Sequence, residues 1–171
     1  MKRMILLSLF CLAGVVMANA QRFALIDMEY IMENIPEYQQ ANNELELASQ
    51  QYQKAVEAKA KEAEALYLAY QKAANTLSAT QRTQKEEAIV AKEREAAELR
   101  KKYFGPEGEM AQKQEALIAP IQNRIYEVVK QISTQKGYDA VIDRASATSI
   151  IFASPRIDIS NEVLAKLGYS N

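Results

Sequence analysis

Residues 37–104 read EYQQANNELELASQQYQKAVEAKAKEAEALYLAYQKAANTLSATQRTQKEEAIVAKEREAAELRKKYF, a run of 68 residues without a glycine or a proline. The run contains 15 alanines, and its 11 acidic side chains balance its 11 basic ones. Ala, Glu, Gln and Lys are strong helix formers, so this composition predicts helix throughout. One straight helix of this length would extend about 100 Å, whereas a hairpin would be about half as long.

A weak point near the middle of the run favours the hairpin. Residues 75–81 include Asn, Thr and Ser, which are poor helix formers. Ser78 and Gln81 have the spacing of a capping box, which marks the start of a helix. We therefore expect an antiparallel hairpin with its tip near residues 75–80.

The hairpin has an apolar seam that is weak in content. Its apolar residues follow one another at spacings of three and four, the periodicity of a coiled coil. Many of them are alanines, whose burial contributes much less than that of leucine at roughly 25 cal/mol per Å². We expect arms that pair and flex. The seam comprises Tyr38, Ala41, Leu45, Ala48, Tyr52, Val56, Ala60, Ala63, Tyr67, Tyr70, Ala74 and Leu77, and on the return arm Ile89, Ala96, Leu99 and Tyr103.

Short apolar runs on either side of the hairpin predict β-strands. Residues 22–27, 138–143 and 149–153 are each bounded by polar or turn-forming residues, as is typical of strands. Asp27 can cap a short helical turn, which ends before Pro36 because the residue before a proline avoids the α region.

The chain after the hairpin predicts two further helices. The Gly-Pro-Glu-Gly run at 105–108 is a strong helix break. A helix with a fuller apolar stripe resumes directly after it, with a kink or a restart at Pro120 and an end at Gly137. Ser160 is expected to cap a last helix that ends at Gly168.

The expected fold is α+β and mainly α. Residues 21–36 and 105–171 form a small β body, and residues 37–104 form a long helical arm that protrudes from it. Three short strands with open edges are marginally stable and prone to association. A β-barrel shared between several chains would close these edges.

The first 20 residues are typical of a cleavable signal peptide. Lys2 and Arg3 precede an apolar run, residues 4–17, which is too short to span a membrane. Residues 18–20, Ala-Asn-Ala, match a small-x-small cleavage site. Cleavage there would remove Cys11, the only cysteine, so the exported protein would need no disulfide. These features predict a periplasmic protein.

The composition argues against catalysis and cofactors. The chain has no histidine and therefore no imidazole base, and one cysteine cannot build a Cys-rich metal site. A net charge of -1 gives no reason to expect a nucleic-acid partner. The glycines at 105–108 lack the Gly-Lys-Ser/Thr ending of a phosphate-binding loop. Asp27, Asp139 and Asp143 fit caps and turns better than a catalytic pair.

Several segments occur in a distinctive order. They are residues 23–38 (FALIDMEYIMENIPEY), Leu77-Ser78 with Gln81-Arg82, residues 102–108 (KYFGPEG), residues 136–139 (KGYD), and Asp158-Ile159-Ser160 with Val163, Leu164, Leu167 and Gly168. Together they resemble the Skp/OmpH family of periplasmic chaperones for outer-membrane proteins, over essentially the whole chain after residue 20.

The resemblance implies a homotrimer. Its β-barrel body would be built from all three chains, and its arms would enclose a cavity that holds unfolded outer-membrane proteins without ATP. Well-known members have basic arms, whereas this arm is neutral overall. No lipopolysaccharide site is therefore carried over, and only a weak contact with a membrane surface is left open.

Two sets of apolar residues are candidate contact sites. Those on the arm would bind client proteins or, alternatively, only pack the two arms together: Leu66, Tyr67, Leu68, Tyr70, Leu77 and Ile89. Those on the strands would form the trimer core or interface: Phe23, Leu25, Val141, Ile142, Ile150, Ile151 and Phe152. An alternative function for the same helices is an oligomeric coiled-coil structural or adaptor protein, which would bind one folded partner.

Overall fold

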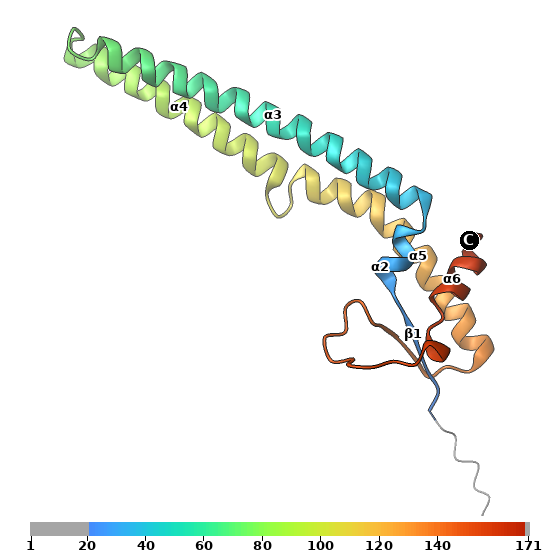
Figure 1. Ribbon diagram of the computed structural model, residues 1–171. Coiled ribbons are helices and arrows are strands. Elements are labelled where there is room, and N and C mark those ends of the chain that lie inside the picture. Colours follow the sequence, from blue (N-terminus) through green and yellow to red (C-terminus); the bar gives the residue numbers. More distant parts are fainter. Residues whose placement is uncertain (1–20, 170–171) are drawn as a thin grey trace, which may run out of the picture. The chain divides into compact units, whose positions relative to one another are not determined.

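The computed structural model describes residues 21–169, so the predicted signal peptide lies outside the described residues (Figure 1). The described chain forms two compact units, one of residues 21–31 with 127–169 and one of residues 32–126. The fold is mainly helical with a long helical hairpin, as the sequence predicts, and its sheet has two strands.

The first unit is organised around two parallel strands. β1 (Phe23–Ile26) pairs with β2 (Ala140–Asp143) in a register that places Phe23 beside Ala140 and Ile26 beside Asp143. On its other side β1 forms a single bridge, from Leu25 to Asp158, and Ile159 donates its N–H to the Leu25 carbonyl at 2.9 Å. β1 is therefore bonded on both edges.

Buried aliphatic side chains from four parts of the chain form the core of this unit. They come from β1, from the end of α5 (Glu109–Lys136), from α6 (Ser160–Leu167) and from Ile31 in α2 (Met28–Glu33). The predicted helix ends are confirmed: Gly137 and Gly168 both have positive φ, which only glycine adopts without strain.

A polar cluster joins the ends of these elements. The Asp27 carboxylate caps α2 by accepting the Tyr30 N–H at 2.9 Å, as predicted. Asp143 accepts the N–H groups of Met28 and Ala145, both at 3.1 Å. Asp139, the third predicted cap or turn residue, accepts the N–H of Arg22 at 2.8 Å.

The predicted role of Ser160 needs correction. Ser160 begins α6, but its side chain makes no cap bond there. The hydroxyl instead accepts the Asp27 N–H at 2.8 Å and donates to Asp158 at 2.7 Å. It is 4 % exposed, and it links the end of β1 to the start of α6.

The third predicted strand, at residues 149–153, is not present in the described chain. These residues form an irregular loop in which Ile151 is fully exposed and Phe152 is 84 % exposed. A strand needs hydrogen-bonding partners for its backbone, and the position beside β1 is taken by Asp158. Within one chain the loop therefore remains without a sheet to join.

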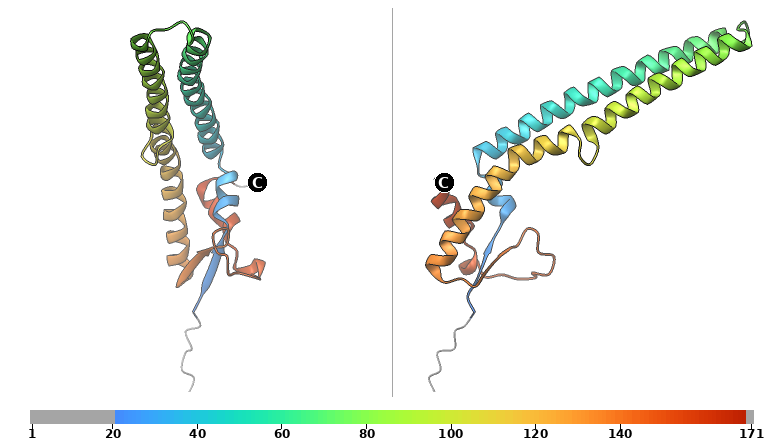
Figure 2. Two further views of the ribbon diagram at one scale, coloured as in Figure 1. Left: turned by 90° about the vertical axis from the view of Figure 1, so that its left-hand side faces the viewer. Right: turned by 180° about the vertical axis from the view of Figure 1, so that it is seen from behind.

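The second unit contains the hairpin. α3 (Pro36–Ala73) and α4 (Ala79–Phe104) run side by side in opposite directions (Figures 1 and 2). The predicted capping box is present: Ser78 accepts the Gln81 N–H at 3.3 Å, and the Gln81 side chain accepts the Ser78 N–H at 2.9 Å. The turn at residues 74–78 therefore reverses the chain.

A tight turn at residues 105–108 separates α4 from α5. Gly108 is buried there, and a Cβ on it would lie 2.8 Å from the Gly105 nitrogen and the Tyr103 carbonyl oxygen. Only glycine allows that close approach. α5 continues as one helix through Pro120 to Lys136, so no second helix starts at the proline.

Beyond this turn, α5 takes the place of α4 beside α3. Lys113 forms an ion pair with Glu44, and Arg124 forms one with Glu37. The compact unit accordingly extends to residue 126. The assignment of residues 105–126 to the body of the assembled protein remains a prediction.

Ser160→Ala is expected to destabilise the first unit. The change leaves the partly buried N–H of Asp27 without its acceptor, which costs about 1–3 kcal/mol. Urea unfolding followed by circular dichroism measures the loss. The control Ser149→Ala removes an exposed hydroxyl without a hydrogen bond in the described chain, and an equal loss in both variants would contradict this role.

Candidate functional site

The interior of the hairpin is made of small side chains. Val56 and Ala63 of α3 are buried along α4, whereas the buried Ala41 and Ala48 precede Tyr52, which meets the end of α4. On α4 only Ile89 is buried. Alanines bury little area, so the two helices hold together through a thin apolar seam.

An aromatic cluster near the end of α4 strengthens this seam. The rings of Tyr52 and Tyr103 stack with centroids 4.1 Å apart, and Phe104 meets Tyr52 edge-on at 6.3 Å. A hydrogen bond to the Glu109 carboxylate raises the pKa of the Tyr52 hydroxyl. Lys102 also pairs with Glu109, at 3.2 Å. The cluster thus ties α3 to both helices at the point where α4 gives way to α5.

A four-residue ionic network links α3 and α4 nearer the tip. Lys59 and Glu62 pair at 3.0 Å, and Lys92 and Glu95 pair at 2.7 Å. The two pairs connect across the helices, with Lys92 to Glu62 at 3.5 Å and Lys59 to Glu95 at 3.9 Å. These charges satisfy one another at the hairpin surface.

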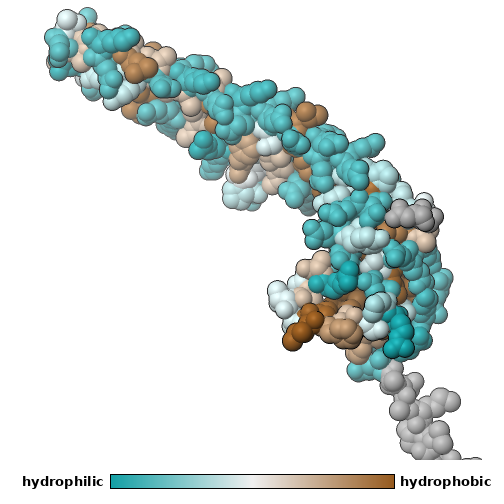
Figure 3. Space-filling view, in the orientation of Figure 1, coloured by the Kyte–Doolittle hydropathy of each residue, from teal (hydrophilic) through white to brown (hydrophobic). Residues whose placement is uncertain are grey.

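A groove with a largely apolar lining lies between α3 and α4. Its volume is about 710 Å³, within the range of ligand-binding clefts. Figure 3 shows light brown apolar surface among the hydrophilic side chains along the arm. From α3 it is lined by Val56, Ala60, Ala63, Glu64 and Tyr67. From α4 and the turn it is lined by Glu93, Ala96, Ala97, Arg100, Lys101, Phe104 and Gly105.

The six arm residues singled out from the sequence fall into different environments. Tyr67 and Leu68 are each 47 % exposed, and Tyr67 lines the groove. Ile89 is buried in the seam. Leu66, Tyr70 and Leu77 are half-buried, and the Tyr70 hydroxyl donates to Glu86 on α4. Their role in client binding stays a prediction.

The sequence reasoning missed the groove because it treated alanines only as weak seam residues. Ala60 and Ala63 on α3 face Ala96 and Ala97 on α4 across the groove. Small residues at matching heights on α3 and α4 are the sequence signal that could have located the groove. Phe104, at 39 % exposure, closes one end and was also not selected.

The seven predicted interface residues also differ in exposure. Leu25 lies in the core of the single chain. Phe23 and Ile142 are exposed, and Val141 and Ile150 are half-buried. Ile151 and Phe152 are the most exposed large apolar residues of the described chain.

The described residues offer no sign of a metal centre or a membrane span. Among residues 21–169, no three metal-ligating side chains lie together. Within the same range, no helix combines the length and apolar character needed to cross a bilayer.

The fold and the groove together define a class: a chain with a small unit built on two paired strands and a long helical hairpin with an apolar groove. The chain belongs to the family described as outer membrane protein (OmpH-like), whose model matches residues 22–167. This is a family of chaperones and not of enzymes.

Two relatives illustrate the similarity. The chain is 25% identical to "Chaperone protein Skp" of Yersinia enterocolitica over 156 residues, which is 91% of this chain and 92% of the relative. Its fold is similar to the crystal structure of a putative OmpH-like outer membrane chaperone from Caulobacter crescentus, with a TM-score of 0.66 at 13% identity. That match covers 86% of this chain and 83% of the other.

The ionic network predicts that acid weakens the hairpin. A hydrogen bond from Lys59 lowers the pKa of the Glu62 carboxyl. Because the folded pKa is below the unfolded one, ionised Glu62 stabilises the hairpin above the unfolded pKa. That contribution is lost as the pH falls below the ordinary glutamate pKa and through the folded pKa of Glu62.

Thermal melts followed by circular dichroism at several pH values test this prediction. On acidification the melting temperature of the wild type should fall, and that of the Glu62→Gln variant should fall less. The control Glu87→Gln, an exposed residue of α4 without an ion pair in the described chain, should retain the whole drop. Identical pH responses in Glu62→Gln and the wild type would contradict it.

Proposed function

We propose that the protein is an ATP-independent periplasmic holdase that binds unfolded outer-membrane proteins between its helical arms and prevents their aggregation. The observation that carries the proposal is the apolar surface on the arm, namely the groove and the exposed side chains of Tyr67 and Leu68. Membership of the OmpH-like family supports it.

The weak packing of the arm suits this function. An unfolded β-barrel protein exposes many apolar residues and aggregates readily. Because α3 and α4 pack through alanines, they can change their spacing to suit clients of different size. Many weak contacts with one client then add up through high effective concentration. No contact needs to be strong, so release needs no nucleotide.

The exposed loop of the first unit supports a homotrimer. Ile151 and Phe152 expose large apolar side chains next to a sheet of only two strands. Such a small sheet is marginal alone, and a patch of this kind marks a contact with another chain. In the proposed trimer these residues, with the other predicted interface residues, complete a shared barrel.

The proposed location is the periplasm, reached through the signal peptide predicted at residues 1–20. The remaining chain lacks cysteine and so needs no disulfide in that oxidising compartment.

The holdase is tested by diluting a urea-unfolded outer-membrane barrel protein into buffer with and without the purified protein. Light scattering on a sizing column should find a soluble complex of three chains and one client, with no nucleotide added. A stable trimer that leaves the client to precipitate would favour the structural adaptor instead.

The contact residues on the arm are tested in the same assay. Tyr67→Ser with Leu68→Ser should lower the anti-aggregation activity several-fold, because it removes two exposed apolar side chains from the arm. The matched control is Tyr126→Ser with Leu47→Ser, the same residue types at 62 % and 60 % exposure away from the tip. Equal losses in the two double variants would refute the assignment.

The interface is tested by Ile151→Asp with Phe152→Asp. Charges in a buried interface are costly without partners, so the mass in solution should fall from three chains to one. The control Thr148→Asp with Ser149→Asp places the same charges at exposed polar positions of the same loop and should remain trimeric. A trimer in the first variant would place the interface elsewhere.

A further inference from the structure

The groove of the hairpin is electrically polarised. Glu64 and Glu93 lie with Tyr67 at the end of the groove nearer the hairpin tip. Arg100 and Lys101 lie with Phe104 at the other end, near the turn at residues 105–108. The order follows from the antiparallel pairing, in which residues nearer the tip on α3 face residues nearer the tip on α4. Between the two charged ends the floor is formed by alanines.

The four charged side chains of the groove are available to a ligand. Within residues 21–169, none of them forms an ion pair or a side-chain hydrogen bond. The neighbouring charges outside the groove behave differently, since Lys59, Glu62, Lys92 and Glu95 are paired with one another. The four charges at the ends of the groove are therefore open.

The size of the groove selects a short segment of chain. From Val56 to Tyr67 the α3 backbone rises about 17 Å, at ~1.5 Å per residue. An extended chain covers that distance in about five residues at ~3.3 Å each. The alanine floor leaves the volume of about 710 Å³ for the side chains of the occupant.

We infer that the groove binds an extended apolar segment of about five residues with a basic residue at one end and an acidic residue at the other. The basic residue lies beside Glu64 and Glu93, and the acidic residue lies beside Arg100 and Lys101. This inference rests on the proposed function, and it names the client chemistry that each arm selects.

A second copy of the arm is a poorer occupant. In an antiparallel pair of arms the opposite charges would also meet, but two concave alanine floors facing each other would leave both grooves unfilled. An extended segment of an unfolded protein presents side chains that project into the groove. Apolar burial and charge complementarity then act together on one ligand.

The test uses the purified protein and fluorescent seven-residue peptides with blocked ends and five central Val, Phe and Leu residues. One peptide has Lys at one end and Glu at the other, and a second has Lys at both ends. By fluorescence anisotropy the wild type should bind the Lys/Glu peptide about tenfold more tightly, because a second Lys meets Arg100 and Lys101.

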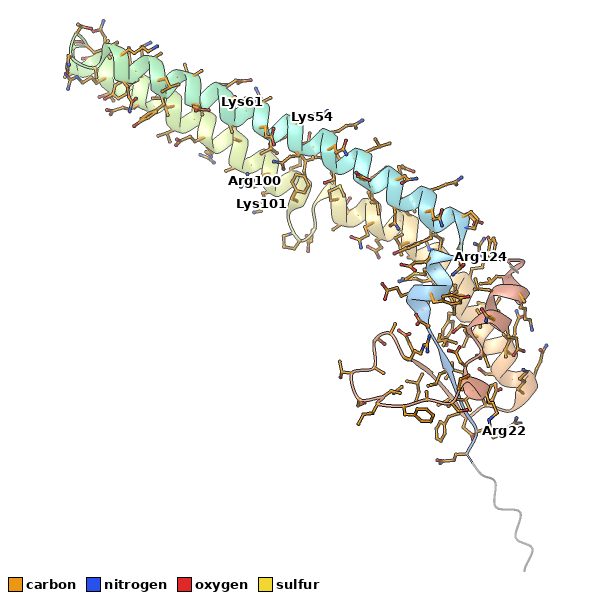
Figure 4. All side chains as sticks on the ribbon, in the orientation of Figure 1. Arg22, Lys54, Lys61, Arg100, Lys101 and Arg124 are labelled. Carbon is orange, nitrogen blue, oxygen red and sulfur yellow. The ribbon has the colours of Figure 1, made fainter. Side chains whose placement is uncertain are left out.

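Charge reversal should exchange this preference. Arg100→Glu with Lys101→Glu makes both ends of the groove acidic, so the Lys/Lys peptide should bind more tightly. The control Lys54→Glu with Lys61→Glu makes the same change in net charge at two exposed residues of α3 outside the groove (Figure 4). This control should bind the Lys/Glu peptide more tightly, as the wild type does. If both double variants prefer the same peptide, the inference is overturned.

Filling the groove gives an independent readout. Ala60→Phe with Ala97→Phe places two rings on the groove walls and should abolish peptide binding, with helicity retained. Ala65→Phe with Ala88→Phe, at exposed positions that do not line the groove, should bind as the wild type does. If filling the groove changes the mass in solution and leaves peptide affinity intact, the groove is an interface between copies and the inference fails.

The anti-aggregation assay separates this inference from the proposed function. A wild-type protein that keeps the outer-membrane protein soluble, with no exchange of peptide preference on charge reversal, overturns the groove assignment and leaves the holdase intact. A wild-type protein that ranks the peptides as expected but lets the outer-membrane protein precipitate supports the groove and refutes the holdase.

Discussion

The parallel pairing of β1 with β2 is the constraint on which the rest of the chain depends. It joins Phe23 to Ala140, so everything between them is an insertion into one small sheet. Closing a flexible loop of this length would cost about 4 kcal/mol of chain entropy. The hairpin reduces that cost, because α3 leads the chain away and α4 and α5 lead it back. The polar cluster of Asp27, Asp143 and Ser160 then fixes the ends of the strands.

Few contacts hold the two helices of the hairpin together. Its seam is largely alanine, and its stronger interhelical contacts are the aromatic cluster around Tyr52 and the network around Glu62. Few of its side chains fill the space between the helices, and that same sparseness leaves the groove open. A weak seam and an open groove are therefore two consequences of one composition.

The single chain leaves apolar surface uncovered in both of its units. In the first unit the loop with Ile151 and Phe152 is exposed, and in the second the groove and Tyr67 are exposed. Exposed apolar patches on a soluble protein usually mark contacts with other molecules. The two patches differ in kind, since the loop exposes two large side chains whereas the groove is lined largely by alanines and is charged at its ends. This difference fits one fixed partner at the loop and many variable partners at the groove.

Features that depend on local chemistry could be predicted from the sequence: the helices of the hairpin, the capping box of Ser78 and Gln81, the cap by Asp27 and the glycine stops at Gly137 and Gly168. Each follows from propensity or from contacts within a few residues. Three outcomes required the folded chain: residues 149–153 form no strand in one chain, α5 continues through Pro120, and the alanines of α3 and α4 face each other across a groove. These outcomes depend on which segment occupies the edge of β1 and on the register between two helices, and contacts between residues distant in the sequence determine both.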